Sequence, residues 1–446
     1  MSSARRNDPQ VEASPSPPAV DRLSKLPMEL LQKIFDDAYA TDKPTEPLSR
    51  TLLPLFDRCV WRDVKVVGDK RLVAFSATFQ TRPSVGRHCR TLKVQHLKSP
   101  AVSQASLEAV FANLPNLTKL VVHDDWEMFL DVLLPAGRQA LFPFSSSIRH
   151  FACLCKTQRA DPYHPAYLGS LASMTNLTVL QLILRHKSRI KTLRSRAHGG
   201  AVPLPPLDVL SVSVSHGPSF DSLHLLLQSV PTIKTLVVKH YEEPSSLVKV
   251  ISALAAPEHV AQLFLITSST LHSALPAELK QLAGLKQIIF RGNFSRLGRD
   301  SFDVLRALPL ERIEVCKKSD ISAIELSLLV DGPRRLSSLK KLKLDNVDGK
   351  AGDVADVTYE DVAMDFEPAG WELPMWTSSF GYDDYLDLKM KATKANVAIS
   401  GTVKNAARVE EKWEMAILAL EDDSEEWDLY DSEIDEEYWL LEDGCG

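Results

Sequence analysis

A pattern of apolar residues, apolar-x-x-apolar-x-apolar, recurs ten times between residue 89 and residue 345. The middle apolar positions of the ten copies lie 25 to 31 residues apart, at Leu92, Leu120, Phe151, Leu180, Leu210, Leu236, Leu263, Ile288, Ile313 and Leu342. Each copy predicts a short strand whose alternate side chains face inward. Segments with helical periodicity lie between the copies, at 103–114, 219–230, 245–255, 274–283 and 301–308. One such unit cannot bury its own apolar face, so neighbouring units must stack into one continuous core.

A strand followed by a helix at this period resembles a leucine-rich repeat. The resemblance implies an α/β solenoid, a horseshoe whose parallel strands line the concave side, over residues 67–349. The Asn that the family places after the strand occurs only in Leu285-x-x-Ile288-x-Phe290-x-x-Asn293. The alternative is an ordinary doubly wound α/β domain, but ten evenly spaced strands are more than such a sheet usually needs.

The segment LSKLPMELLQKIF, residues 23–35, predicts a short helix ahead of the repeats. Pro27 suits the first helical position and Glu29 suits the positive helix start. Its apolar residues are more than a helix of two to three turns can hide alone, and they are Leu26, Leu30, Leu31, Ile34 and Phe35. The helix therefore needs a partner, either within this chain or outside it.

The motif Leu26-Pro27-x-Glu29-Leu30-Leu31-x-x-Ile34-Phe35 resembles the start of an F-box, and residues 48–66 resemble its final helix followed by the first strand. The resemblance covers residues 22–66 and implies a small helical module that docks on the Skp-type linker subunit of cullin–RING ubiquitin ligases. The residues that would dock are Leu26, Pro27, Leu30, Leu31, Ile34 and Phe35. The residues alone also allow a helix that merely caps the first repeat, as solenoids require.

The concave face is the expected surface for a protein target. Val237, Phe264, Ile266 and Ile289 occupy outward strand positions in three consecutive repeats. They predict an exposed apolar patch of the kind that marks a partner site. The alternative is that Val, Ile and Phe are there because they favour strands whatever they face.

The sequence contains none of the common catalytic motifs. A Gly-rich phosphate loop, Gly-x-Ser-x-Gly, His-Glu-x-x-His and Cys-x-x-Cys are all missing. Cys153 and Cys155 continue the inward alternation of a strand, and His123 is expected in a solvated turn beside Asp124. We therefore expect no catalytic residues, no metal ligands and no cofactor, and an enzyme within the irregular segment 350–446 is the disfavoured alternative.

Charge is distributed unevenly along the chain. Residues 421–443 contain 13 acidic side chains and no Lys or Arg, whereas residues 1–420 carry 45 acidic against 52 basic side chains, a formal net charge of +7. Residues 1–21 predict a disordered leader, and 421–446 predict an acidic disordered tail. Between the repeats and this tail, residues 350–420 predict an irregular segment that ends in a capping helix at 403–420.

Residues 185–200 form a basic insertion with three alternative interpretations: a nucleic-acid or nuclear-import patch, a docking site for the acidic tail, or a solvated loop. No aromatic residue interleaves with these bases, so nucleic-acid binding is disfavoured. No apolar stretch is long enough to span a bilayer. The six cysteines are scattered, which favours an intracellular location, cytoplasmic or nuclear, over a disulfide framework.

These features together predict a non-enzymatic substrate-recognition adaptor of an SCF-type ubiquitin ligase, with a protein target on the repeat domain and the linker subunit on residues 22–66. The alternative is a stand-alone leucine-rich repeat scaffold whose N-terminal helices only cap the solenoid. The target's identity depends on side chains that meet in three dimensions, and no linear motif encodes it.

Overall fold

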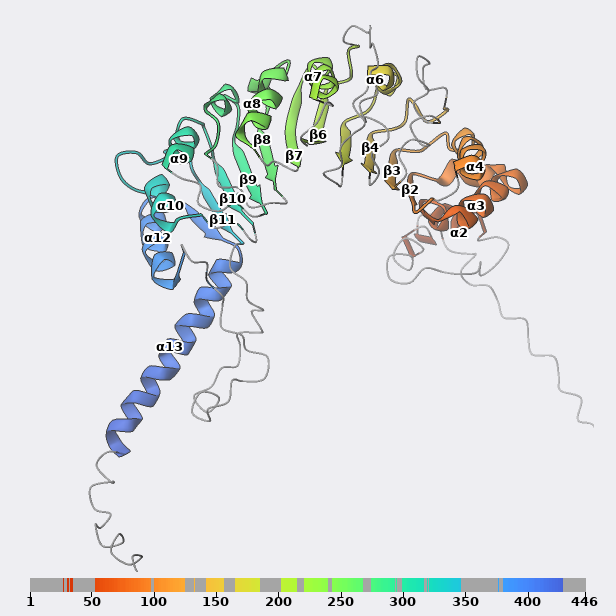
Figure 1. Cartoon of the computed structure of the whole chain (residues 1–446). Helices are drawn as coiled ribbons and strands as arrows, with labels where there is room; N and C mark the ends of the chain where they lie inside the picture. Colours follow the sequence, from red (N-terminus) through yellow and green to blue (C-terminus); the bar gives the residue numbers. More distant parts are fainter. Residues whose placement is uncertain are drawn as a thin grey trace, which may run out of the picture.

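The computed structural model describes 27, 30–31, 33–34, 53–97, 100–124, 132, 142–155, 165–184, 202–214, 220–239, 243–267, 274–292, 294, 299–316, 319, 321–345, 376 and 380–427. Within these residues the chain forms a curved array with one continuous sheet on its inner side (Figure 1).

The sheet has 12 strands, and their spatial order follows the sequence without exception. Every pairing is parallel, and the strands are β1 (Asp63–Val67), β2 (Thr91–Gln95), β3 (Lys119–Asp124), β4 (His150–Cys155), β5 (Val179–Leu184), β6 (Leu207–Ser213), β7 (Ile233–Lys239), β8 (Gln262–Ile266), β9 (Gln287–Arg291), β10 (Arg312–Val315), β11 (Lys341–Leu344) and β12 (Ala398–Ser400). Each strand pairs only with its sequence neighbours, which excludes a doubly wound order. The architecture fits a leucine-rich repeat solenoid.

The predicted inward positions are in register along the whole sheet. The ten apolar residues that define the repeats pair from one strand to the next, from Leu92 with Leu120 through to Ile313 with Leu342. All ten are fully or almost fully buried. The same row continues to Val64 on β1 and Ile399 on β12, so the array has one more strand at each end than the repeat pattern predicts.

Helices cover the outer side of the sheet (Figure 1). The described helices are α2 (Leu53–Val60), α3 (Asp69–Thr81), α4 (Pro100–Ala112), α6 (Pro165–Ala172), α7 (Phe220–Ser229), α8 (Pro244–Ala253), α9 (Arg299–Arg306), α10 (Ala323–Val330), α12 (Tyr382–Lys394) and α13 (Thr402–Trp427), with 3₁₀ segments η2 (Pro83–His88), η3 (Pro257–His259) and η4 (Ala277–Gln281). Helix α13 is the exception, because most of it projects beyond the sheet (Figure 1). The helix predicted at 274–283 is only the 3₁₀ segment η4. Pro276 has extended backbone and disfavours helical backbone at the residue before it, and Leu282 leaves helical geometry at the other end.

A ladder of hydrogen bonds ties the start of each strand to the preceding repeat. The amides of Thr118 and Lys119 both donate to the Arg90 carbonyl, and the same arrangement recurs along the array. Asn116 Nδ2 also donates to the Arg87 carbonyl over 2.9 Å, and Asn176 Nδ2 donates to the Ser146 carbonyl over 2.6 Å. These asparagines precede their strands, whereas the family pattern predicted a ladder Asn after the strand, and Asn293 lies outside the described residues.

The C-terminal end of the array is closed by α12, β12 and the first turns of α13. Phe380, Tyr385 and Leu388 are buried there, and Asp345 Oδ1 accepts a hydrogen bond from the Thr402 amide over 3.0 Å. The strand β12 lies in a segment predicted to be irregular. The helix predicted at 403–420 extends to Trp427, so its last seven residues belong to the segment predicted as a disordered tail.

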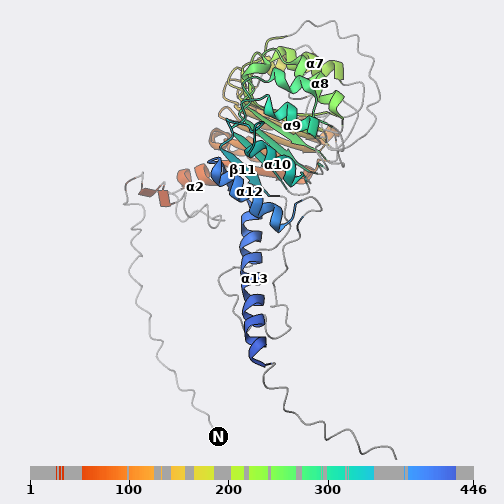
Figure 2. The same cartoon turned by 90° about the vertical axis from the view of Figure 1, so that its left-hand side faces the viewer.

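Helix α13 runs away from the array, as both views show (Figures 1 and 2). Among the described helices, not one combines the length and the apolar character that crossing a membrane would need.

Candidate functional site

None of the described helices lies on the inner face of the sheet, so the side chains that point away from the helices line the concave side of the arch (Figure 1). Of these side chains, Ala152 and Ser211 are almost fully buried. The central row of this surface runs from the N-terminal to the C-terminal end as Lys65, Lys93, Val121, Ala152, Gln181, Ser211, Val237, Phe264, Ile289, Glu314 and Lys343. Its chemistry changes along the array, from basic to apolar to a network of ion pairs.

The apolar stripe consists of Val237, Phe264, Ile266 and Ile289, the four residues predicted to bind a target. The register places Val237 opposite Phe264 and Phe264 opposite Ile289, so the structure brings them together on β7, β8 and β9. Val237, Phe264 and Ile266 are half-buried on the concave surface. Ile289 is only 6% exposed, which corrects the prediction that it contributes exposed area.

A polar network explains the burial of Ile289. The next strand places Glu314 opposite Ile289, and the Glu314 carboxylate accepts from Gln287 Nε2 over 2.6 Å and lies 2.7 Å from Arg312 Nη2. Gln287 on β9 and Arg312 on β10 both point to the concave side of the sheet. They hold Glu314 against the sheet beside Ile289, and Glu314 itself is 7% exposed.

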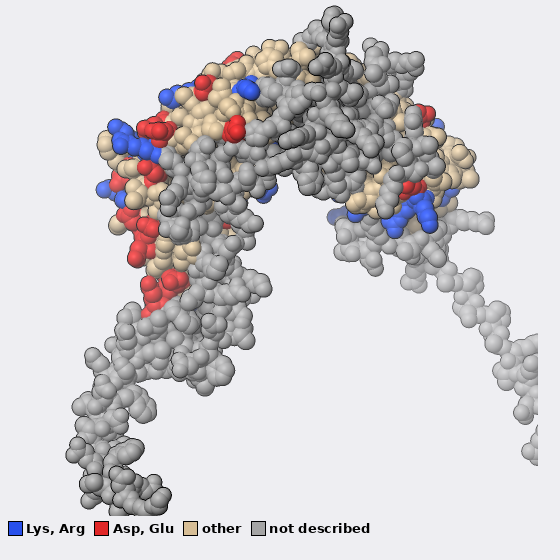
Figure 3. All heavy atoms as spheres, viewed as in Figure 1, with Lys and Arg blue, Asp and Glu red and all other residues tan. Residues whose placement is uncertain are grey.

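The lysine row, Lys65, Lys93 and Lys119, occupies the opposite end of the concave surface. Lys65 lies directly opposite Lys93 on β1 and β2. Lys119 on β3 is on the same side of the sheet but lies opposite Thr91, two residues along the strand from Lys93. His150 lies opposite Lys119 on β4. Burial, together with the nearby Lys119 charge, lowers the pKa of His150 to about 4, so this imidazole is neutral at pH 7. In the space-filling view, basic side chains gather on the N-terminal arm of the arch, whereas acidic side chains are prominent on the C-terminal arm (Figure 3).

The N-terminal helix separates its apolar residues onto two sides. Leu30 and Leu31 both donate backbone hydrogen bonds to the Pro27 carbonyl, which starts the helix as predicted. Leu31 is 3% exposed and packs in a small cluster with Leu55 and Cys59. Leu30 and Ile34 remain 50% and 44% exposed. Leu26 and Phe35, the other predicted docking residues, lie outside the described part of the chain.

Helix α2 joins this N-terminal helix to the solenoid. Its Asp57 carboxylate is ion-paired with Arg82 at the end of α3, and Trp61 stacks on Phe75 with ring centroids 5.9 Å apart. The small cluster around Leu31 therefore sits on an anchored helix. Leu30 and Ile34 remain exposed on the other side of the N-terminal helix.

Cys153 and His123, which the sequence raised as candidates for metal binding or acid–base chemistry, both belong to strands. Cys153 is buried as predicted, and burial with the nearby Asp63 charge raises the pKa of the Cys89 thiol to about 12. His123 is part of β3 and lies opposite Leu154, so the prediction of a turn there is wrong. Within the described residues, no group of three or more His, Cys, Asp or Glu side chains could hold a metal ion.

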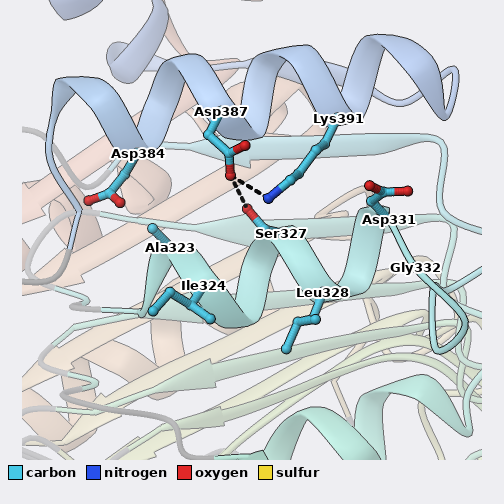
Figure 4. A pocket seen from close by; sticks show the side chains of 9 residues that line it. All are labelled: Ala323, Ile324, Ser327, Leu328, Asp331, Gly332, Asp384, Asp387 and Lys391. Carbon is cyan, nitrogen blue, oxygen red and sulfur yellow. Dashed lines mark hydrogen bonds and ion pairs between the residues drawn. The ribbon is translucent and has the colours of Figure 1, made fainter.

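Sequence reasoning missed a shallow groove of about 220 Å³ between α10 and α12, away from the concave surface (Figure 4). Asp387 accepts a hydrogen bond from Ser327 across it over 3.4 Å and pairs with Lys391 on the same helix, α12, at 2.5 Å. Ile324 and Leu328 form its outer wall, and Ile324 is 71% exposed. Their i, i+4 spacing was the available signal, but an amphipathic stripe on a repeat helix is normally read as core.

Comparisons with known proteins do not extend these assignments. No protein-family model and no curated protein matches the chain. Among solved structures, the chain is similar to the one described as "Crystal structure of TLR13-ssRNA13 complex", with 13% sequence identity and a TM-score of 0.28. The match covers 64% of this chain and 44% of that chain, so the region compared is less than half of the other protein. The solenoid architecture rests on the twelve-stranded sheet and its register.

Proposed function

We propose that the chain is a protein-interaction scaffold that holds a protein target on its concave surface. The observation that carries this proposal is the apolar stripe on the inner face, where Val237, Phe264 and Ile266 are partly accessible side by side. Half-buried aromatic and branched side chains on a concave surface provide apolar area that a partner can cover. Flanking charges would orient that partner without contributing most of the affinity.

The N-terminal helix favours a more specific role, the substrate-recognition adaptor of an SCF-type cullin–RING ubiquitin ligase. Leu31 of this helix packs against Leu55 and Cys59 of the same chain, whereas Leu30 and Ile34 present apolar surface that no described residue covers. A Skp-type linker subunit would bury that surface and connect the target to the ligase. This role requires an intracellular location, cytoplasmic or nuclear.

The docking half is tested by pull-down of the full chain with a purified Skp-type linker subunit. We expect Ile34→Asp to abolish binding, because the interface would bury an unpaired carboxylate. Lys33→Asp is the matched control, since Lys33 is exposed on the same helix but is not part of its apolar stripe. Both variants should unfold at the same temperature as the parent. Failure of the parent to bind would leave the scaffold function with a helix that only caps the array.

The target-binding half is tested with Phe264→Ser in affinity purification from cells. We expect loss of the main protein partner, because burying a Phe side chain contributes roughly 1.5–3 kcal/mol. Met390→Ser is the control, as Met390 is 67% exposed on α12, outside the concave surface. An unchanged partner set for the Phe264 variant would contradict the assignment of the apolar stripe.

A further inference from the structure

The lysine row at the N-terminal end of the concave surface is uncompensated within the described residues. No carboxylate there forms an ion pair with Lys65, Lys93 or Lys119. The basic residues at the other end of the surface differ, because Arg312 pairs with Glu314 at 2.7 Å and Lys343 pairs with Asp345 at 2.5 Å. Basic side chains at the C-terminal end of the concave surface are therefore paired with carboxylates, whereas, among the described residues, the three lysines at the N-terminal end are not.

Like charges directly opposite each other on neighbouring strands destabilise a sheet. Lys65 and Lys93 are such a pair, and Lys119 adds a third charge one strand further. An anionic segment lying across β1, β2 and β3 would remove this repulsion and gain charge-assisted hydrogen bonds.

Apolar side chains lie beside the lysine row, so a ligand that covers both must carry apolar as well as acidic groups. Lys93 lies opposite Val121, which is partly exposed, and Leu154 on β4 is partly exposed on the same side of the sheet. A ligand that spans this region needs acidic and apolar side chains in one short segment. Residues 428–446 of this chain have that composition: eight acidic side chains, no Lys or Arg, and Ile434, Tyr438, Trp439, Leu440 and Leu441.

The acidic segment could come from the same molecule or from a second copy, and the position of helix α13 favours the second copy (Figure 1). Helix α13 has 26 residues and leads away from the array, so residue 428 starts about 39 Å from the cap. The sheet between β12 and β3 spans nine strand spacings, about 43 Å. Residues 428–446 span at most about 65 Å when fully extended, and they start at the end of a helix that leads away from the sheet, so binding the lysine row of their own molecule requires a long extended path. A second copy is free of this restriction.

We propose that the lysine row binds the acidic C-terminal segment, residues 428–446, of a second copy of the chain. This head-to-tail contact goes beyond the proposed adaptor function and does not depend on it. It would occupy one end of the concave surface and compete with an acidic target there.

A peptide of residues 428–446 with a fluorescent label is the probe, added to a chain that ends at Trp427 and so keeps every described element. We expect binding that weakens as salt rises from roughly 0.01 M to roughly 0.15 M, because the Debye length falls from about 30 Å to about 8 Å. Lys93→Glu should reduce the peptide affinity at least tenfold. Lys280→Glu, an equal charge change on η4 outside the concave surface, should not alter it.

Sedimentation of the full-length chain provides the second readout. We expect its mass to rise with concentration at low salt, and the rise to vanish both in the chain ending at Trp427 and in Lys93→Glu. Absence of peptide binding by the folded chain would overturn the proposal. Peptide binding combined with a full-length chain that is monomeric at every concentration would also overturn it, because the segment would then occupy the row of its own molecule.

Discussion

Ile289 and Glu314 lie directly opposite each other on β9 and β10, and both are buried although both face the concave side of the sheet. The carboxylate of Glu314 is held by Gln287 and Arg312, so a charged side chain covers an apolar neighbour without being left unpaired. This pair marks the point where the concave surface changes from a partly open apolar stripe to a closed polar network. Substitutions on either side of this point should therefore differ in their effect on the free energy of unfolding.

Ile289→Ser should lower the free energy of unfolding by about 2–4 kcal/mol, because it deletes a buried branched side chain and leaves a hydroxyl beside Glu314. Phe264→Ser should lower it by about 1 kcal/mol, since Phe264 is already partly exposed. Urea denaturation of the two variants checks the difference. Equal losses would mean that the two side chains share one environment, against the burial seen here.

Arg82→Ala should destabilise the N-terminal end of the array by about 1–3 kcal/mol, because it leaves the buried Asp57 carboxylate without its charged partner. Asp57 Oδ1 already lacks a hydrogen-bond partner within the described structure, which adds to the cost. Arg87→Ala is the control, as Arg87 is exposed on η2. Thermal unfolding of both variants is the measurement, and a loss for Arg87→Ala as large as for Arg82→Ala would refute the role of the ion pair.

Gly292→Ala should cost more stability than Gly332→Ala. Both glycines have a left-handed backbone, with φ of +113° and +90°, so both replacements carry a strain of about 1–3 kcal/mol. Only at Gly292 would the added Cβ lie 2.1 Å from a backbone oxygen, that of Thr267 on the preceding repeat. We expect an additional loss of at least about 1 kcal/mol in chemical denaturation. Similar losses would show that the two repeats can separate there without penalty.

Acidification should destabilise the protein through His150. Its pKa is about 6.5 in the unfolded chain and about 4 in the fold, so the unfolded state binds the proton more tightly. The contribution of neutral His150 is complete above pH 6.5 and is lost as pH falls towards 4, by about 1–2 kcal/mol after allowance for partial exposure. Unfolding of the parent and of His150→Gln, compared at pH 7.5 and pH 4.5, isolates this contribution. A pH dependence that is unchanged in the variant would assign the effect to other groups.

The repeat pattern by itself determined which side chains build the core. Leu92, Leu236 and Ile313 were identified as inward-facing because a parallel strand buried by outer helices must place an apolar residue at every second position. The same periodicity determined the stacking order, since a solenoid unit contacts only its sequence neighbours. The helical start at Pro27 was also local, because it depends on one residue's missing N–H and on the residues that follow it.

The tertiary structure alone decided what each surface exposes. Ile289 is hidden because Glu314, 25 positions later in the chain, lies beside it, and Lys65 faces Lys93 because two strands 28 residues apart are in register. Likewise, the three residues of β12 became a strand because the sheet edge at β11 was available to pair with them. Periodicity tells which way a side chain points, whereas its neighbours across the sheet are set by strand register, and charge pairing and exposure follow from those neighbours.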